Sequence, residues 1–129
     1  MNRKILITAS ILGLLSIALG AFGAHGLKQL VSPESVQTFE TGVKYQMYHA
    51  LMLLFVGSTS FLTNKTKRMV FVFVLIGIIF FSGSIYGLST NELSTFDFKT
   101  IALITPIGGV LLIASWLLML IGFLKTNAE

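Results

Sequence analysis

The side chains with the most capacity for chemistry in this 129-residue chain are polar groups that border or interrupt long apolar stretches. They are His25, Tyr45, Gln46, His49, Tyr86 and Thr105. On a helix, His49 shares a face with Gln46 or with Tyr45. Such groups can relay protons or bind a quinone-like headgroup or a metal, because histidine titrates near neutral pH. The alternative is structural: His49 hydrogen-bonds between helices, and the tyrosines anchor helix ends.

Metal binding and catalysis lack the residues they would need. The chain has two histidines and no cysteine, whereas a catalytic zinc takes three protein ligands. Haem ligation by His25 and His49 has only those histidines in its favour, since no haem attachment motif is present. All five acids lie outside the apolar stretches, so no Ser/His/Asp set, paired carboxylates or phosphate loop can be assembled. We therefore predict no catalytic residue, no metal, no cofactor and no enzyme.

Four apolar stretches without acidic or basic side chains must position these groups. They cover residues 5–24, 45–62, 69–88 and 101–124. Each is long enough to cross about 30 Å of hydrocarbon as a helix. Hydrophobic residues make up 54% of the chain and charged residues 11%, which leaves too little polar surface for a soluble domain. The sequence predicts an all-α membrane protein, a four-transmembrane-helix bundle forming one membrane domain over residues 1–129.

The positions of the cations predict the orientation of this bundle. Six of them flank one side, namely Arg3, Lys4, Lys65, Lys67, Arg68 and Lys125, and three flank the other, namely Lys28, Lys44 and Lys99. By the positive-inside rule, both termini face the cytoplasm. The first stretch resembles a signal peptide, but it is longer than a usual signal core, so we expect it to remain as a helix. The cations form no patch interleaved with aromatic residues, so the lipid bilayer, and no nucleic acid, is the expected partner.

A helix start is predicted in the segment between the first two spans. Ser32–Glu34 combines a capping hydroxyl, a proline and an acid. Val36, Phe39 and Val43 then recur at helical spacing. This pattern predicts an amphipathic helix on the outer surface. It either continues into the second span or joins it through Gly42, a candidate hinge.

Small residues are predicted to mediate helix packing, because apolar burial cannot drive association inside lipid. The candidates for close contact are Gly20 on the first span, Gly83 and Gly87 on the third, and Gly109 on the fourth. Packing within the chain is one interpretation, and association with a second copy or with another membrane protein is the other.

The fourth span carries two further signals. Pro106 lies a little over one turn into the predicted span, where it would kink the helix and free a carbonyl. Trp116 lies deeper than the interface, so its indole is expected to face the bundle and find an acceptor.

A common depth is predicted for the six polar candidates. Counted along the four spans, His25, Tyr45, Gln46, His49, Tyr86 and Thr105 all fall within roughly 8 Å of the outer interface. They would then form one outward-facing polar cluster to which all four helices contribute.

Four blocks of sequence resemble the signature blocks of the DUF423 family, also called UPF0382. The blocks are residues 20–28 (GAFGAHGLK), 45–51 (YQMYHAL), 83–86 (GSIY) and 105–109 (TPIGG), each at a separate span. The resemblance covers nearly the whole chain and implies a small bacterial plasma-membrane protein. Ser115 stands before Trp116 where the family pattern has glycine, which is expected to polarise a contact there. The resemblance implies no established activity and no site residues to carry over.

Three functions are compatible with this sequence. The favoured one is a non-enzymatic structural or accessory factor that associates with itself or with another membrane protein. The alternative is a small binding or transport protein with an outer site around His25 and His49. A third is a redox carrier that binds haem or quinone.

Overall fold

The computed structural model describes residues 2–93 and 102–126. These residues form four α-helices and two short 3₁₀ turns, with no strand among them. The helices are α1 (Asn2–Ala24), α2 (Pro33–Ser58), α3 (Asn64–Ser89) and α4 (Ile104–Leu124), and the turns are η1 (Leu27–Gln29) and η2 (Asn91–Leu93). The all-α prediction is confirmed.

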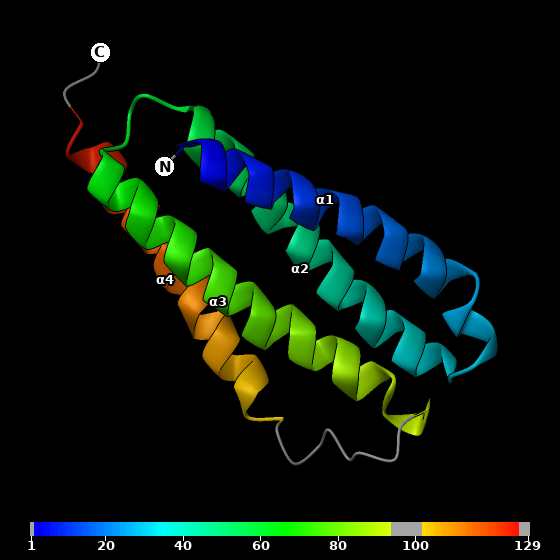
Figure 1. Cartoon of the computed structure of the whole chain (residues 1–129). Helices are drawn as coiled ribbons and strands as arrows, with labels where there is room; N and C mark the ends of the chain where they lie inside the picture. Colours follow the sequence, from blue (N-terminus) through cyan, green and yellow to red (C-terminus); the bar gives the residue numbers. More distant parts are fainter. Residues whose placement is uncertain (1, 94–101, 127–129) are drawn as a thin grey trace.

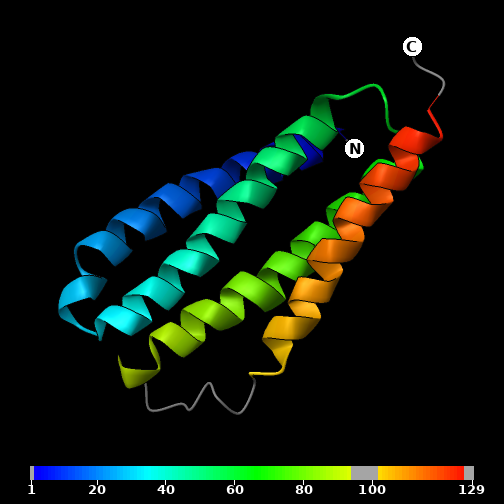
Figure 2. The same ribbon diagram turned by 180° about the vertical axis from the view of Figure 1, so that it is seen from behind.

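The helices form two antiparallel hairpins that lie side by side (Figure 1). The main contacts join α1 to α2, α2 to α3 and α3 to α4. Seen from behind, the start of α1 and the end of α4 lie at the same end of the molecule as the α2–α3 loop (Figure 2). We call this the termini end. The opposite end holds η1 and η2.

Three segments are long and apolar enough to cross a membrane. They are Asn2–Gln29, Asn64–Ser89 and Ile104–Leu124. In length and composition these segments agree with the first, third and fourth predicted spans. Ile101, the first residue of the fourth predicted span, and Lys99 before it lie outside the described residues. α2 is similar in length to α3, but polar residues in its first half keep it outside this group.

α2 is one continuous helix that joins the predicted amphipathic segment to the second predicted span. Ser32 caps it, since the Ser32 side chain accepts a hydrogen bond from the Ser35 amide at 3.2 Å, and Pro33 is its first residue. This start was predicted. The hinge at Gly42 was wrong: Ser82 Oγ donates to the Gly42 carbonyl at 2.8 Å, and a Cβ at Gly42 would lie 2.7 Å from the Tyr86 ring. The helix also ends at Ser58, earlier than the predicted residue 62.

The predicted kink at Pro106 is also wrong. α4 begins at Ile104, so Pro106 lies in its first turn. A proline there removes a backbone donor that has no partner within the helix in any case. The kink prediction assumed that the helix began several residues earlier.

The closest approach between helices occurs where α3 meets α4. A Cβ on Gly108 would lie 2.8 Å from the Gly77 carbonyl oxygen and would collide with the Phe81 amide. A Cβ on Gly77 would lie 2.7 Å from Leu112. These glycines let the two backbones touch, which is the packing mode expected in lipid.

The predicted packing glycines lie in looser surroundings. A Cβ on Gly109 would make ordinary contact with Phe81 at 3.7 Å, and one on Gly20 would lie 3.5 Å from Val43. A Cβ on Gly83 would meet nothing within 4 Å. Gly83 therefore faces outward, and Gly77 and Gly108 occupy the role that the sequence motifs assigned to their neighbours.

Candidate functional site

Gln46 connects three helices. Its side chain is 4% exposed. Gln46 Nε2 donates to the Leu12 carbonyl of α1 at 2.9 Å, and Gln46 Oε1 accepts from the Tyr86 hydroxyl of α3 at 2.6 Å. Each half of the amide thus has a partner on a different helix. In an apolar surrounding, such bonds fix the position of α2 between its neighbours.

His49 connects α2 to α4. Trp116 Nε1 donates to His49 Nε2 at 3.1 Å, and His49 Nδ1 lies 2.7 Å from the Tyr45 carbonyl oxygen. The indole nitrogen is only a donor and the carbonyl only an acceptor. The neutral ring with its proton on Nδ1 is therefore the form that satisfies both contacts. The prediction that Trp116 would find an acceptor is confirmed, although half of its surface is exposed.

Serines that the sequence analysis did not single out complete the polar contacts. Ser82, on α3, bonds to the Gly42 carbonyl, and Ser84 shares a hydrogen bond with Thr105 of α4. Both serines are buried. Small hydroxyls within an otherwise apolar helix were the available signal, but serine also bonds to its own helix, as Ser16 does with the Leu12 carbonyl.

We call the side chains that bond between helices the interhelical polar set. Its members are Gln46, His49, Ser82, Ser84, Tyr86, Thr105 and Trp116. Among the described residues, no buried side-chain nitrogen or oxygen lacks a hydrogen-bond partner. The set therefore has the properties of a structural network, in which each member bonds to another part of the chain.

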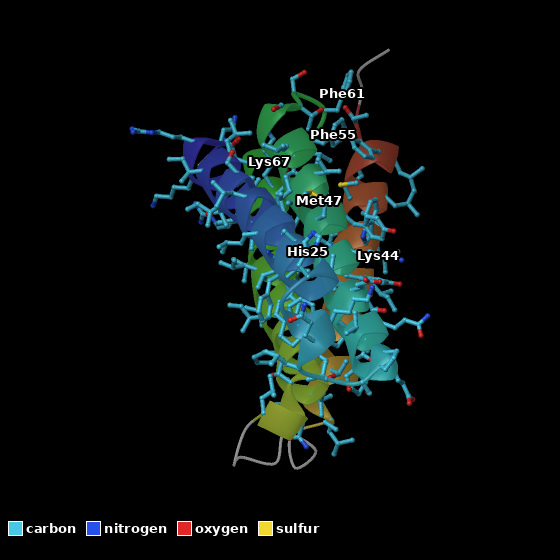
Figure 3. All side chains as sticks on the ribbon, turned by 90° about the vertical axis from the view of Figure 1, so that its right-hand side faces the viewer. His25, Lys44, Met47, Phe55, Phe61 and Lys67 are labelled. Carbon is cyan, nitrogen blue, oxygen red and sulfur yellow. The ribbon has the colours of Figure 1, made fainter. Side chains whose placement is uncertain are left out.

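His25 does not belong to this set. It is exposed in the segment between α1 and η1, where it lines a shallow surface pocket with Ala24, Gly26, Lys28 and Gln29. Figure 3 shows His25 on the side of the molecule away from the labelled residues of the termini end. Tyr45 is partly exposed, and its ring lies 4.9 Å from that of Phe81.

The prediction of a common depth is wrong. Gly13, at the middle of α1, faces Ala50, so its neighbour His49 lies near the middle of the bundle. Gly13 precedes Ala24 by eleven residues, or about 16 Å of helix. The error came from starting α2 at residue 45, whereas it starts at Pro33. Of the six predicted residues, Gln46 bonds to Tyr86 and His49 to the Tyr45 carbonyl, whereas Thr105 bonds elsewhere and His25 is exposed. The two histidines are not in contact.

The described residues offer few ligands for a metal ion or a haem. Within the described residues, no three histidine, cysteine, aspartate or glutamate side chains are grouped so that they could hold a metal ion. The Nε2 atom of His49 is the usual ligating atom of a haem histidine, and here it accepts from Trp116. A ligand at His49 would have to displace the indole.

The helices and their buried polar contacts define a small helical membrane protein, and comparison with known proteins shows its family. Residues 19–109 match the family model of DUF423, whose description is a protein of unknown function. A UPF0382 membrane protein of Staphylococcus saprophyticus is 39% identical over 123 residues, which cover 95% of this chain and 98% of the relative. The chain belongs to the DUF423, or UPF0382, family of membrane proteins.

Two further relatives agree with this assignment. The UPF0382 membrane protein YwdK of Bacillus subtilis is 39% identical over 128 residues, covering 95% of this chain and 98% of the relative. The UPF0382 inner membrane protein YgdD of Escherichia coli is 35% identical over 131 residues, covering 99% and 95%. No solved structure matches this chain. The membrane location expected from the resemblance is confirmed.

Proposed function

We propose that this protein is a four-span structural or accessory factor of the bacterial plasma membrane, with both termini cytoplasmic and no enzymatic activity. The proposal rests on one observation: every member of the interhelical polar set hydrogen-bonds to another part of the chain. A site that binds or transforms a ligand needs donors, acceptors or a nucleophile left free for that ligand. Here Gln46, His49 and Tyr86 bond to other helices. Their roles are therefore to hold α1 to α4 in register.

The fourth span in this proposal is α2. It runs antiparallel to α1 and packs against both α1 and α3. Because α1 and α3 are apolar enough to span, a helix of 26 residues packed between them crosses the same bilayer. Gln46 and His49, which lower its apolarity, bond to neighbouring helices, whereas Glu40 and Lys44 are exposed in its first half. The cation count supports a cytoplasmic location of the termini end.

Cysteine labelling tests this topology, since the natural chain contains no cysteine. Gln29→Cys and Asn64→Cys replace exposed residues at opposite ends of α2. In intact cells a membrane-impermeant maleimide should label Gln29→Cys at once and Asn64→Cys only after permeabilisation. Equal labelling of both positions from outside would mean that α2 does not cross the membrane.

Association through α3 is the second part of the proposal. Gly83 is exposed, and the space above it is empty to at least 4 Å. A glycine on an exposed helix face offers its backbone to a second helix, as in small-residue contacts between membrane helices. We therefore place a self-association surface at Gly83, with Gly87 one turn further along the same face.

Crosslinking of the protein in vesicles measures that association. Gly83→Leu should abolish the crosslinked dimer without unfolding the monomer, because Gly83 is exposed and a Cβ there meets no neighbouring atom within 4 Å. Ala21→Leu is the matched control, because Ala21 is also small and exposed but lies on α1. A wild-type protein that stays monomeric at all protein-to-lipid ratios, or a dimer that survives Gly83→Leu, would contradict the proposed surface.

The absence of a bound redox group is tested by absorption. Because Trp116 occupies the ligating nitrogen of His49, the purified protein should show no Soret band, also after incubation with haemin. A Soret band that disappears in His49→Ala would identify His49 as an axial ligand and overturn the structural assignment of this residue.

A further inference from the structure

A groove at the termini end contains cationic side chains that the proposed function does not use. It has a volume of about 600 Å³ and lies between the α2–α3 loop, the start of α3 and the end of α4. Its polar lining comprises Ser60, Thr63, Lys65, Thr66, Lys125 and Thr126, and its apolar lining comprises Phe61, Leu62, Met69, Leu118, Ile121 and Gly122. We call it the basic groove.

Within residues 2–93 and 102–126, the two lysines of the basic groove have no counter-charge. Lys65 and Lys125 are exposed, and neither has an ion pair or side-chain hydrogen bond among the described residues. Lys67, at the same end, differs because it is buried and donates to the Asn2 side chain at 3.2 Å. Figure 3 shows Lys67 and Phe61 together at this end. Unlike Lys67, the groove lysines leave their charge available to a ligand.

The start of α3 adds to the positive potential of the basic groove. The first turn of α3 contains Lys65 and no acidic residue. A cation at a helix N-terminus is unfavourable, because the exposed amides already carry partial positive charge. An anion in the groove would relieve this repulsion and interact with both lysines. Charge complementarity therefore points to an anionic occupant.

The groove has its lysines at the rim and apolar side chains one turn deeper, so it matches the headgroup and acyl chains of a phospholipid. Met69 lies one turn after Lys65 on α3, and Ile121 lies one turn before Lys125 on α4. Along both helices, the apolar residue is thus about 6 Å deeper in the bundle than the lysine. A headgroup phosphate between the lysines would place its acyl chains along Met69, Leu118 and Ile121.

We propose that the basic groove binds an anionic phospholipid of the cytoplasmic leaflet through its headgroup phosphate. Lys65 and Lys125 contact the phosphate, and the hydroxyls of Thr63 and Thr66 lie in the same lining. Basic pockets between helices on the cytoplasmic side are recognised sites for such lipids. The depth argument rests on the proposed four-span topology. The affinity of the groove does not depend on which way the protein faces.

Lipid retention tests the proposal. The full-length protein is reconstituted in nanodiscs that contain equal amounts of phosphatidylglycerol and phosphatidylcholine in both leaflets, and the lipids retained after extraction are counted by native mass spectrometry. Both leaflets contain the anionic lipid, so the result is independent of orientation. The double variant Lys65→Gln/Lys125→Gln should lower the retention of phosphatidylglycerol roughly 30-fold, given the usual contribution of each lysine. Retention of phosphatidylcholine should not change.

The matched control removes two cations from the same end without touching the groove. Lys4 and Arg68 are exposed and do not line it. Lys4→Gln/Arg68→Gln should retain phosphatidylglycerol as the wild type does. An equal loss in both double variants would mean general charge attraction and overturn the site. Displacement of the lipid by millimolar inorganic phosphate would also overturn it, by showing that the groove takes a free anion.

Discussion

The interhelical polar set and the basic groove differ in whether their polar side chains already have bonding partners. In the first, Gln46, His49 and Tyr86 donate to or accept from other helices of the same chain. In the second, Lys65 and Lys125 line an open cavity without a partner among the described residues. Polar atoms that are already bonded stabilise the fold, whereas charged atoms left free at the surface can bind something else.

A side chain that could take part in chemistry is therefore not always free to bind a ligand. Histidine and tyrosine are the residues with the widest chemistry, yet here their bonding partners are internal. In the sequence, the lysines indicate only the topology. If the comparison holds, variants of the interhelical polar set should change stability, and variants of the basic groove should change lipid binding.

The largest loss of stability is expected when α3 and α4 are forced apart. Gly108→Ala places a methyl group against the backbone of Gly77 and Phe81, which cannot move aside as a flexible side chain can. We expect a loss of about 3 kcal/mol or more, because the separation also breaks the contact of Ser84 with Thr105 across the same interface. Thermal unfolding in detergent measures it. Gly109→Ala is the control and should stay within about 0.5 kcal/mol of the wild type.

Gln46→Leu should have the next largest effect. It removes the bonds to the Leu12 carbonyl and the Tyr86 hydroxyl together and leaves a partly buried phenol without its acceptor. The expected loss is about 1–2 kcal/mol. A double-mutant cycle with Tyr86→Phe should give a coupling of about 0.6 kcal/mol or more. Additive effects of the two substitutions would contradict a direct bond between these side chains.

His49→Ala should cost less, because one of the two bonds it removes lies within its own helix. The chain has a single tryptophan, so its fluorescence reports directly on the partner of Trp116. We expect a shifted emission maximum in His49→Ala and an unchanged spectrum in His25→Ala, since His25 lies elsewhere. The same shift in both variants would mean that the fluorescence follows a global change.

The smallest effect on stability is expected from the groove lysines. In phosphatidylcholine alone, Lys65→Gln/Lys125→Gln should leave the free energy of unfolding within about 0.5 kcal/mol of the wild type. Both side chains are exposed and have no partner among the described residues. A large destabilisation in this lipid would place the lysines among the structural residues and remove the contrast between the two regions.

Much of the fold could be predicted from the sequence, because long apolar runs and the Ser32–Pro33 start are local signals. The rotation of each helix about its axis was not predictable in this way. Glycines at motif spacing indicated Gly83, Gly87 and Gly109, yet the backbone contact is at Gly77 and Gly108. Which glycine faces a neighbour depends on the packing of all four helices, and a spacing motif contains no information about it.

The sequence indicated most of the polar residues that bond between helices, but not how these residues are arranged in space. Gln46, His49, Tyr86 and Thr105 do bond between helices, whereas His25 is exposed at the end of α1. The predicted depth assumed that the second span begins at residue 45, whereas that residue lies well inside the helix that begins at Pro33. The basic groove was missed because Lys65 and Lys125 lie 60 residues apart in the sequence and line one groove only when α3 packs on α4.

The most direct test of the account compares thermal unfolding in nanodiscs of phosphatidylcholine with unfolding in nanodiscs that also contain phosphatidylglycerol. We predict that phosphatidylglycerol stabilises the wild type, that Gln46→Leu is destabilised equally in both lipids, and that Lys65→Gln/Lys125→Gln loses only the stabilisation by phosphatidylglycerol. If Gln46→Leu abolished the lipid effect and the lysine variant kept it, the assignment of structure to one region and ligand binding to the other would be contradicted.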